Sequence, residues 1–553
     1  MSQFIKEKLL VLVLAAPLLA TSARANIYVT DLKLNGSEPL AIAAGFSAIN
    51  ITYILNEPAT LGVTINIAFG TNLIRTLTAA PGAQGASFGH NSVPWDGNDS
   101  TGLPAPSGSY VISVIAAANG HTNWAQISQD ANAGNYVFDP RGLALNNYSN
   151  SPYYGRIFLG NAGTGPHSAT VPGDQITILK LNADGTFADE GSNGDGGYVM
   201  TDLGDNSVPQ KMRVAADDRL YMMDLSSYSQ LVAFDMLLST NEVVLSPGNY
   251  LENPFWADSL SLGVGWFSMD VTDANATNGL IWLGQWDSGG AGIWNWHLTN
   301  GVADPTNDVG NWAVAVGGNL SVAASGGLMV DSNYDIFVGQ YLTDSGDPNP
   351  DCMEFTNWNN GLSYGGEPVT NGAAWSVGGG DNTFLGVYDT TIDSRQQPKY
   401  VACALNGGPD GGIRILNATN GAVVVTNLDA TNLYYVTAWD NVGNLYAASG
   451  TSHLLRVFSP PGPTNQATLT GAIQIESAIT SITLSGNNLI IDFVASRGDS
   501  PGQFTLQNGA TVNGSFVNVS GAVPTQISPG FFTVSTTKPT ASVQFYRISG
   551  GTP

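Results

Sequence analysis

The sequence predicts an all-β protein with a β-propeller at its centre. Two observations lead to this fold class. Glycine accounts for 66 of the 553 residues and charged residues for only 11%, which is typical of turn-rich β-structure rather than of long helices. A short motif also recurs across residues 135–462: a small apolar run, a polar turn and a second apolar strand. A loose repeat built from short strands is typical of propeller blades.

The motif is regular enough to count. Its second strands begin near residues 157, 220, 281, 336, 400 and 445. In the copy at Asp331–Gly339, Asp-Ser-Asn supplies turn residues that hydrogen-bond their own backbone, and Ile-Phe-Val packs well on a pleated sheet. A single four-stranded blade cannot bury both faces, whereas six stacked around an axis can. We therefore count six blades, or seven if Pro305–Asn319 hides further strands. An array of ordinary β-sandwiches is the alternative.

A small β-sandwich is expected over residues 26–120. Runs of alternating or β-branched residues recur there, and turns that carry Gly, Asn or Pro separate most of them. These runs are Ile27–Val29, Ile49–Leu55, Val63–Ile67, Leu73–Leu77 and Tyr110–Val114.

The same region resembles the immunoglobulin-like domain of the flagellar hook-capping protein, a domain that recurs in secreted bacterial proteins. The resemblance runs from Tyr53 to Tyr110 and rests mainly on Trp95-Asp96-Gly97 and on Pro106–Tyr110. It implies a structural or spacer module in which Trp95 anchors the core. It does not imply a role in hook assembly, because a leader replaces the hook-binding part. The central repeat is similar in style to the NHL propellers of secreted proteins.

Two further segments complete the predicted layout. Residues 121–134 form a polar linker before the propeller at 135–462, and residues 463–553 form a C-terminal β-sandwich. The boundary falls at Pro460-Pro461-Gly462-Pro463, because consecutive prolines cannot continue a sheet ladder.

The first 25 residues have the pattern of a secretory signal peptide. Lys6 and Lys8 precede an apolar core that runs to Ala20, and an Ala-x-Ala site predicts cleavage between Ala25 and Asn26. We expect a secreted, periplasmic or cell-surface protein whose mature chain has no transmembrane segment. Removal of residues 1–25 takes the formal charge from −25 to −27. This charge disfavours nucleic acid as a partner.

Two features leave alternatives open. Cys352 and Cys403 lie in or near adjacent blades of an exported chain, so they form either a disulfide or two unpaired thiols. The acidic loops at Asp96–Gly102 and 182–198 are either solvated turns or calcium sites; the first lacks the bidentate glutamate that closes a calcium loop. No cofactor other than Ca²⁺ is suggested.

Tryptophan is concentrated in one part of the predicted propeller. Nine of the twelve tryptophans lie between Trp256 and Trp375. Flat aromatic rings beside amides and carboxylates suit sugar binding, because a ring covers the apolar face of a sugar while polar groups bind its hydroxyls. The alternative is that these rings fill gaps between blades. The candidate ligand-binding residues are Trp286, Asp287, Trp294, Trp296 and Trp358.

No established catalytic motif is present in the sequence. The five histidines are dispersed, and there is no nucleophile elbow or phosphate-binding loop. A glycosidase would need paired carboxylates, for which the candidates are Asp270, Asp287, Asp335 and Glu354.

The favoured interpretation is therefore an exported, non-catalytic binding or scaffolding protein. Its propeller face would recognise a polysaccharide or another protein. The alternatives are a carbohydrate-active glycosidase or lyase, and a structural or adhesive surface-layer component.

Overall fold

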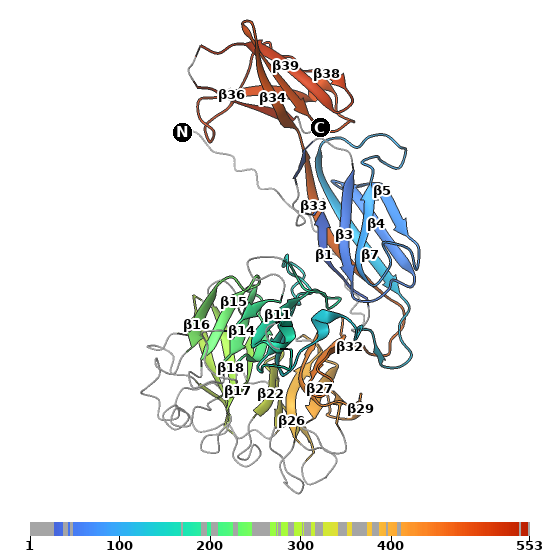
Figure 1. Ribbon diagram of the computed structural model, residues 1–553, viewed down its shortest axis with the longest axis vertical. Helices are drawn as coiled ribbons and strands as arrows, with labels where there is room; N and C mark the ends of the chain where they lie inside the picture. Colours follow the sequence, from blue (N-terminus) through green and yellow to red (C-terminus); the bar gives the residue numbers. More distant parts are fainter. Residues whose placement is uncertain are drawn as a thin grey trace, which may run out of the picture.

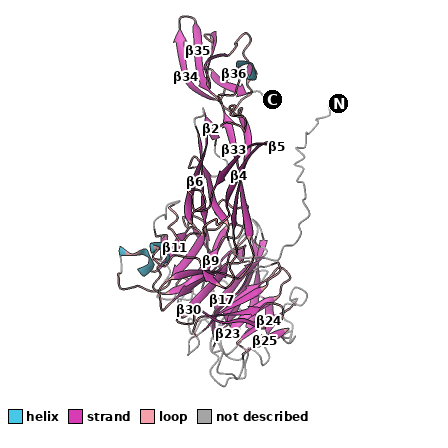
Figure 2. Cartoon of the chain, turned by 90° about the vertical axis from the view of Figure 1, so that its right-hand side faces the viewer, coloured by secondary structure: helices cyan, strands magenta, loops and turns pink. Residues whose placement is uncertain are grey.

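The chain folds into three β-rich parts that follow one another along the molecule (Figures 1 and 2). The structure is a computed structural model that describes residues 27–36, 42–44, 48–167, 170–189, 196–200, 208–224, 230–245, 266–272, 274, 278–285, 292–300, 302–303, 311–315, 325–340, 351–356, 373–378, 386–393, 396–405, 411–540 and 543–550. The predicted all-β class is confirmed. No helix in this described part is long and apolar enough to cross a membrane. The signal-peptide prediction lies outside the described residues.

The middle part is a sandwich of two sheets. One sheet has the order β1-β3-β6 and the other β2-β33-β7-β4-β5. The strand bounds are β1 Val29–Leu34, β2 Ile42–Ala44, β3 Ile49–Leu55, β4 Gly62–Phe69, β5 Asn72–Ala79, β6 Gly89–Trp95, β7 Gly108–Ala118 and β33 Asn465–Glu476. The strands expected between residues 26 and 120 are present, except that the first begins at Val29 rather than at Ile27.

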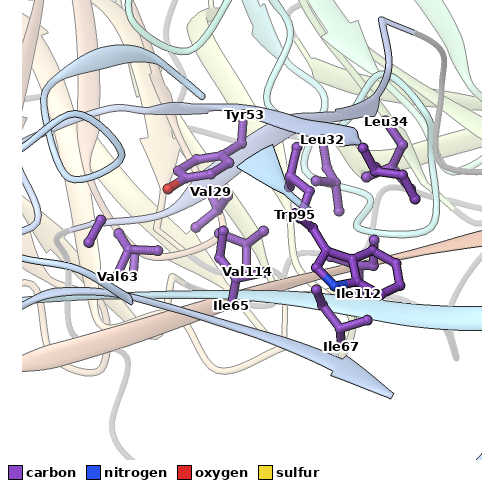
Figure 3. Close-up of a cluster of buried hydrophobic side chains, with 14 of the residues drawn as sticks. Val29, Leu32, Leu34, Tyr53, Val63, Ile65, Ile67, Trp95, Ile112 and Val114 are labelled. Carbon is purple, nitrogen blue, oxygen red and sulfur yellow. The ribbon is translucent and has the colours of Figure 1, made fainter. Parts of the chain in front are cut away.

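Trp95 lies at the centre of the sandwich core (Figure 3). Its side chain is fully buried and packs edge-on against Tyr110 at a centroid distance of 5.4 Å. The indole nitrogen donates to the carbonyl of Asn98 at 2.9 Å, so this polar group is satisfied where the chain leaves β6. The prediction that Trp95 anchors this core is confirmed.

The sandwich is completed by a strand from far along the chain. β33 pairs antiparallel with β7, from Asn465 opposite Ala118 to Ile475 opposite Gly108. The sequence analysis placed residues 465–476 in the C-terminal sandwich, whereas the structure places them here. The reason is that pairing between distant segments leaves no local pattern in the sequence. Everything between Ala118 and Asn465 is therefore inserted between two neighbouring strands.

The described residues of the inserted part form six consecutive antiparallel sheets. The first contains β9 (Pro140–Leu145), β10 (Ile157–Asn161), β11 (Thr177–Leu181) and β12 (Tyr198–Val199). The second contains β13 (Gln210–Val214), β14 (Arg219–Met223), β15 (Leu231–Asp235) and β16 (Asn241–Leu245). The third contains β17 (Trp266–Thr272), β18 (Asn278–Gln285), β19 (Gly292–Thr299), β20 (Val302–Ala303) and β21 (Asn311–Ala315).

The remaining three sheets have four strands each and also follow one another along the chain, except that the last strand of the sixth sheet, β8, comes from the start of the insert. The fourth contains β22 (Ser325–Val330), β23 (Ile336–Gln340), β24 (Cys352–Phe355) and β25 (Trp375–Val377). The fifth contains β26 (Val387–Ile392), β27 (Tyr400–Leu405), β28 (Ile413–Asn417) and β29 (Val423–Leu428). The sixth contains β30 (Tyr434–Trp439), β31 (Leu445–Ser449), β32 (Leu455–Ser459) and β8 (Ala125–Gln126). All six copies of the sequence motif coincide with the first and second strands of these sheets. The strand within Pro305–Asn319, β21, belongs to the third sheet.

The first strands of the six sheets contact one another in cyclic order. β9 contacts β13, and the contacts continue through β17, β22, β26 and β30 back to β9. Glycine permits the close approach at one of these contacts. A Cβ atom at Gly327 in β22 would overlap the amide nitrogen of Thr390 in β26.

The two ends of the insert meet in the sixth sheet. β8, from the segment expected to be a linker, pairs with β32, and Ile127 donates its amide to Val457 at 2.8 Å. Arg456 adds an ion pair to Asp130 at 2.7 Å. These contacts tie the start of the insert to its last sheet.

The C-terminal part is a second small sandwich. Its sheets have the orders β34-β35-β39-β38 and β37-β36-β40, and its core contains Phe493, Phe504 and Phe532. The strands are β34 Ala478–Ser485, β35 Asn488–Val494, β36 Phe504–Gly509, β37 Val517–Asn518, β38 Thr525–Ser528, β39 Phe531–Thr537 and β40 Phe545–Gly550.

Polar contacts join the three parts. The hydroxyl of Tyr28 in the first sandwich lies 3.0 Å from that of Tyr446 in the sixth sheet, and both rings are buried. At the other end of the first sandwich, Asp499 accepts the amide and hydroxyl of Ser107 at 2.9 and 2.5 Å.

Candidate functional site

A cavity of about 320 Å³ lies where the first strands of five of the six sheets end. Five of the six sheets contribute to its lining; none of the lining residues comes from the described part of the third sheet. Such a position, at the centre of convergent elements, is typical of ligand sites. We call this space the axial cavity, and its lining residues are Leu143, Ala144, Leu145, Asn147, Tyr148, Arg213, Val214, Met329, Thr391, Ile392, Asp393, Gln396, Ala438, Trp439, Asp440 and Asn441.

An aspartate or asparagine follows the first strand in most sheets. Asp440 after β30 accepts the amides of Val442 and Asn444 at 3.0 and 2.7 Å. Asp331 after β22 and Asn146 after β9 make the same kind of turn. A side chain that bonds the backbone two residues ahead turns the chain sharply. Of these three residues Asp440 lines the cavity, at its rim.

Two carboxyl groups of the rim are buried. Burial raises the pKa of Asp393 to about 6, although the backbone amides of Lys399 and Tyr400 oppose the rise. Burial raises the pKa of Asp440 to about 7, against the opposing hydrogen bonds from Asn444. Both groups therefore hold their protons in mildly acidic solution.

Arg213 of the cavity lining belongs to a buried cluster of two cations and two anions. Lys211 pairs with Asp389 at 3.2 Å, and Arg213 lies 3.7 Å from Asp270 and 3.9 Å from Asp389. All four side chains are at most 6% exposed. Their formal charges cancel, so the cluster carries no net charge.

The two aspartates also join neighbouring sheets. Asp270 accepts the amide of Val330 at 2.7 Å, and Asp389 accepts the amide of Thr437 at 2.8 Å. Burial lowers the pKa of Lys211 to about 8, and nearby Arg213 adds to the fall while Asp389 opposes it. A buried charge is tolerated when it is paired and hydrogen-bonded. Every charge of this network is paired, and Nε of Arg213 and Oδ1 of Asp389 have ion-pair contacts without a hydrogen bond.

The rim facing the first sandwich carries amide groups. The Tyr154 hydroxyl donates to Oδ1 of Asn441 at 2.6 Å, and Asn147 donates to the carbonyl of Trp439 at 2.8 Å. The exposed Asn441 amide is thus oriented with its NH₂ group available for a ligand. Tyr148 is half-buried and Gln396 exposed on the same lining. Amides, a phenol and apolar strand ends together can hold a molecule with hydroxyls and an apolar face.

The cavity is not where the sequence analysis placed the ligand site. Trp286, Asp287 and Trp358 lie outside the described residues. Trp294 and Trp296 lie on β19, and only their backbone is described. Trp282 is fully buried between the third and fourth sheets, as expected for a core residue.

Of the candidate catalytic carboxylates, Asp335 and Glu354 lie near one another, whereas Asp270 lies elsewhere. Asp270 belongs to the buried ion cluster around Arg213, and Asp287 is outside the described residues. Asp335 and Glu354 lie in the fourth sheet. Burial, with Asp335 and Asp331 nearby, raises the pKa of Glu354 to about 7. Glu354 and Asp335 do not line the axial cavity.

The two cysteines are brought together as free thiols. Cys352 on β24 and Cys403 on β27 are fully buried in one apolar cluster between the fourth and fifth sheets. Burial raises the pKa of the Cys352 thiol, and its hydrogen bond with the Cys403 thiol adds to the rise.

The acidic loops form turns where they are described. Asp99 accepts the amides of Thr101 and Leu103 at 2.8 and 2.9 Å, and Asp184 accepts that of Thr186 at 3.1 Å. No cluster of three or more His, Cys, Asp or Glu side chains within the described ranges could hold a metal ion. Residues 190–195 of the second loop are outside these ranges.

Comparisons with known proteins give little further guidance. No family model and no curated protein matches the chain. Among solved structures, the major allergen Mala s 1 of Malassezia sympodialis matches 62% of this chain and 96% of its own, at 13% identity and a TM-score of 0.30.

Sequence reasoning missed the axial cavity, although a signal for it existed. The Asx residue after each apolar run, as at Asn146, Asp331, Asp393 and Asp440, marks where the first strand ends. Cyclic stacking of the sheets brings these positions together. The clustered tryptophans instead led to the prediction of a ligand site in the region of the third and fourth sheets.

Proposed function

We propose that the chain is an exported protein whose six sheets form a six-bladed β-propeller, and that its axial cavity binds a neutral, hydroxyl-rich ligand of the carbohydrate class. The cyclic contacts of the first strands and the pairing of β8 with β32 support the propeller. The signal-peptide pattern of residues 1–25 supports export. The two sandwiches serve as spacers that carry the propeller.

The charge of the cavity supports a neutral ligand. The charge of Arg213 in the lining is balanced within its buried ion cluster, and the raised pKa values of Asp393 and Asp440 favour their neutral forms in mildly acidic solution. The remaining lining offers the Asn441 amide, the Tyr148 ring and apolar strand ends. The mature chain's charge of −27 further disfavours polyanions.

Isothermal titration of the mature protein with defined oligosaccharides tests this proposal. The probes are neutral β-glucan, xylan and mannan oligosaccharides and, as charged counterparts, pectin and alginate oligosaccharides. A neutral probe should bind. Asn441→Ala should weaken that binding about tenfold, because it removes a hydrogen bond worth roughly 1–1.5 kcal/mol. Asn72→Ala, an exposed amide on β5 of the first sandwich, is the matched control and should bind as the natural chain does.

An assay for reducing ends in the same samples distinguishes binding from catalysis. New reducing ends would contradict a non-catalytic role and favour a glycosidase. Binding that Asn441→Ala leaves unchanged would place the site elsewhere, for instance at the tryptophans near 286–296. Absence of binding to every oligosaccharide tested would contradict the carbohydrate proposal for these glycans.

A further inference from the structure

The surface of the C-terminal sandwich is rich in exposed apolar side chains. Eight of the sixteen large apolar side chains that are exposed in the described structure belong to it. These are Ile482, Leu484, Val512, Val517, Val523, Ile527, Phe531 and Val543. Concentrated exposed apolar groups mark interaction surfaces.

The same part is nearly free of charge. From Ser477 to Pro553 the charged residues are Asp492, Arg497, Asp499, Lys538 and Arg547, which give a net charge of +1. The mature chain carries −27 in total, so residues 26–476 carry −28. Two copies of this protein repel one another over most of their surface. They can approach with little electrostatic cost only through the C-terminal sandwich.

Within this sandwich, β34 is an unprotected edge strand. It is the outermost strand of its sheet, and no described residue pairs with its outer side. Its sequence, Ala-Ile-Thr-Ser-Ile-Thr-Leu-Ser, contains no charged residue and no proline. Edge strands of monomeric proteins normally carry such residues, because free backbone groups otherwise pair with another strand.

Two core-facing side chains on β34 remain half exposed. Ile482 stands opposite Ile491 and Leu484 opposite Leu489, both of which face the core. Ile482 and Leu484 are nevertheless 51% and 55% exposed. The core is therefore left open along this edge, and one further strand would cover it.

We propose that two copies of this protein associate by antiparallel pairing of their β34 strands about a two-fold axis at Thr483. In this register Ile482 of each copy faces Leu484 of the other, on the core side. On the outer side Thr483 faces its own counterpart, and Ser481 faces Ser485. The pairing joins the two four-stranded sheets into one eight-stranded sheet and covers the exposed apolar pair.

Sedimentation velocity of the mature full-length chain tests the pairing. The paired segment is short, so a weak dimer is expected, with Kd between about 1 µM and 1 mM. The double variant Ile482→Lys/Leu484→Lys should remain monomeric at all concentrations, because its like charges would face one another across the pair. Val423→Lys/Val424→Lys alters an equally exposed pair on β29, the edge strand of the fifth sheet, and should dimerise as the natural chain does.

Cysteine cross-linking checks the register independently of affinity. In a chain with Cys352→Ser and Cys403→Ser, Thr483→Cys should form a disulfide-linked dimer with copper phenanthroline and dioxygen, because residue 483 meets itself at the axis. Ser485→Cys, exposed on the same strand, should cross-link far less. A monomer throughout, a dimer that survives Ile482→Lys/Leu484→Lys, or equal cross-linking at 483 and 485 would overturn the proposal.

Discussion

Lys211 of the second sheet and Asp389 of the fifth form a fully buried ion pair, with Nζ 3.2 Å from Oδ1. In the cyclic order of six sheets these two sheets stand three places apart, so the pair spans the centre. Asp389 also accepts the Thr437 amide of the sixth sheet. One carboxylate thus connects three sheets where their first strands converge.

Breaking this pair should destabilise the insert. Lys211→Met leaves Asp389 buried without its closest cation, and such a loss costs about 3–5 kcal/mol. Lys211→Met combined with Asp389→Asn should recover most of the loss, because asparagine still accepts the Thr437 amide. Calorimetric melting of both variants measures the effect. Equal melting temperatures for the natural chain and Lys211→Met would contradict it.

Stability should rise as the solution becomes mildly acidic. The pKa of Asp440 is raised from 3.8 to about 7, so the folded chain binds a proton that the unfolded chain releases between these values. The stabilisation that the protonated Asp440 side chain gives to the folded chain is complete below about pH 4 and is lost as the pH rises through 7. Each pKa unit corresponds to about 1.4 kcal/mol.

Asp440→Asn keeps the turn acceptor and removes the titration. Denaturant unfolding of this variant should therefore depend less on pH between 4 and 7 than that of the natural chain. Asp96→Asn, at an exposed turn carboxyl whose pKa is lowered by the Asn98 amide, should not flatten this slope. A natural chain that loses stability from pH 7 to pH 5 would refute the assignment.

The contact between the fourth and fifth sheets should tolerate no side chain at Gly327. Gly327→Ala places a Cβ against the Thr390 amide, so the melting temperature should fall by several degrees or more. Gly502→Ala is the matched control, since a Cβ there meets nothing within 4 Å. A similar melting temperature for the two variants would argue against the close approach of β22 and β26.

The first sandwich should fold without the insert. Ala118 and Asn465 are directly paired on neighbouring strands, so residues 120–464 can be replaced by a short Asn-Gly turn. Trp95 is then the only tryptophan, and its fluorescence should remain blue-shifted and melt cooperatively. Emission typical of exposed indole would show that the sandwich needs the insert.

The thiols of Cys352 and Cys403 should be oxidised in protein recovered from an oxidising compartment. They touch between two sheets, and each gives up one hydrogen to a disulfide-type oxidant as the S–S bond forms. The intact chain should then weigh two hydrogens less and show no free thiol in denaturant. Two titratable thiols in such a preparation would contradict this expectation.

The sequence was informative where the pattern is local. The motif at Asp331–Gly339 and its five relatives located the first two strands of every sheet, because apolar strand and Asx turn are encoded side by side. The outer strands were harder, since they are partly exposed and short. β33 could not be assigned to the first sandwich, because its partner β7 lies hundreds of residues earlier.

The candidate site was predictable only in part. Asp393, Asp440 and Asn441 stand in unremarkable turns, and only the cyclic order of the sheets brings them to one cavity. Tryptophan is conspicuous in any sequence, yet Trp282 is buried for packing, and Trp439, which lines the cavity, lies outside the tryptophan-rich segment. The residues that line the cavity are distant from one another in the sequence, so no local sequence pattern predicts that they meet.

Titration of the best neutral oligosaccharide into Asn441→Trp is the most direct test of the axial cavity as the ligand site. Asn441 is exposed at the rim, so an indole there blocks entry without disturbing the strands. Binding should disappear while the melting temperature stays that of the natural chain. Unchanged binding to a folded Asn441→Trp protein would contradict the proposed site.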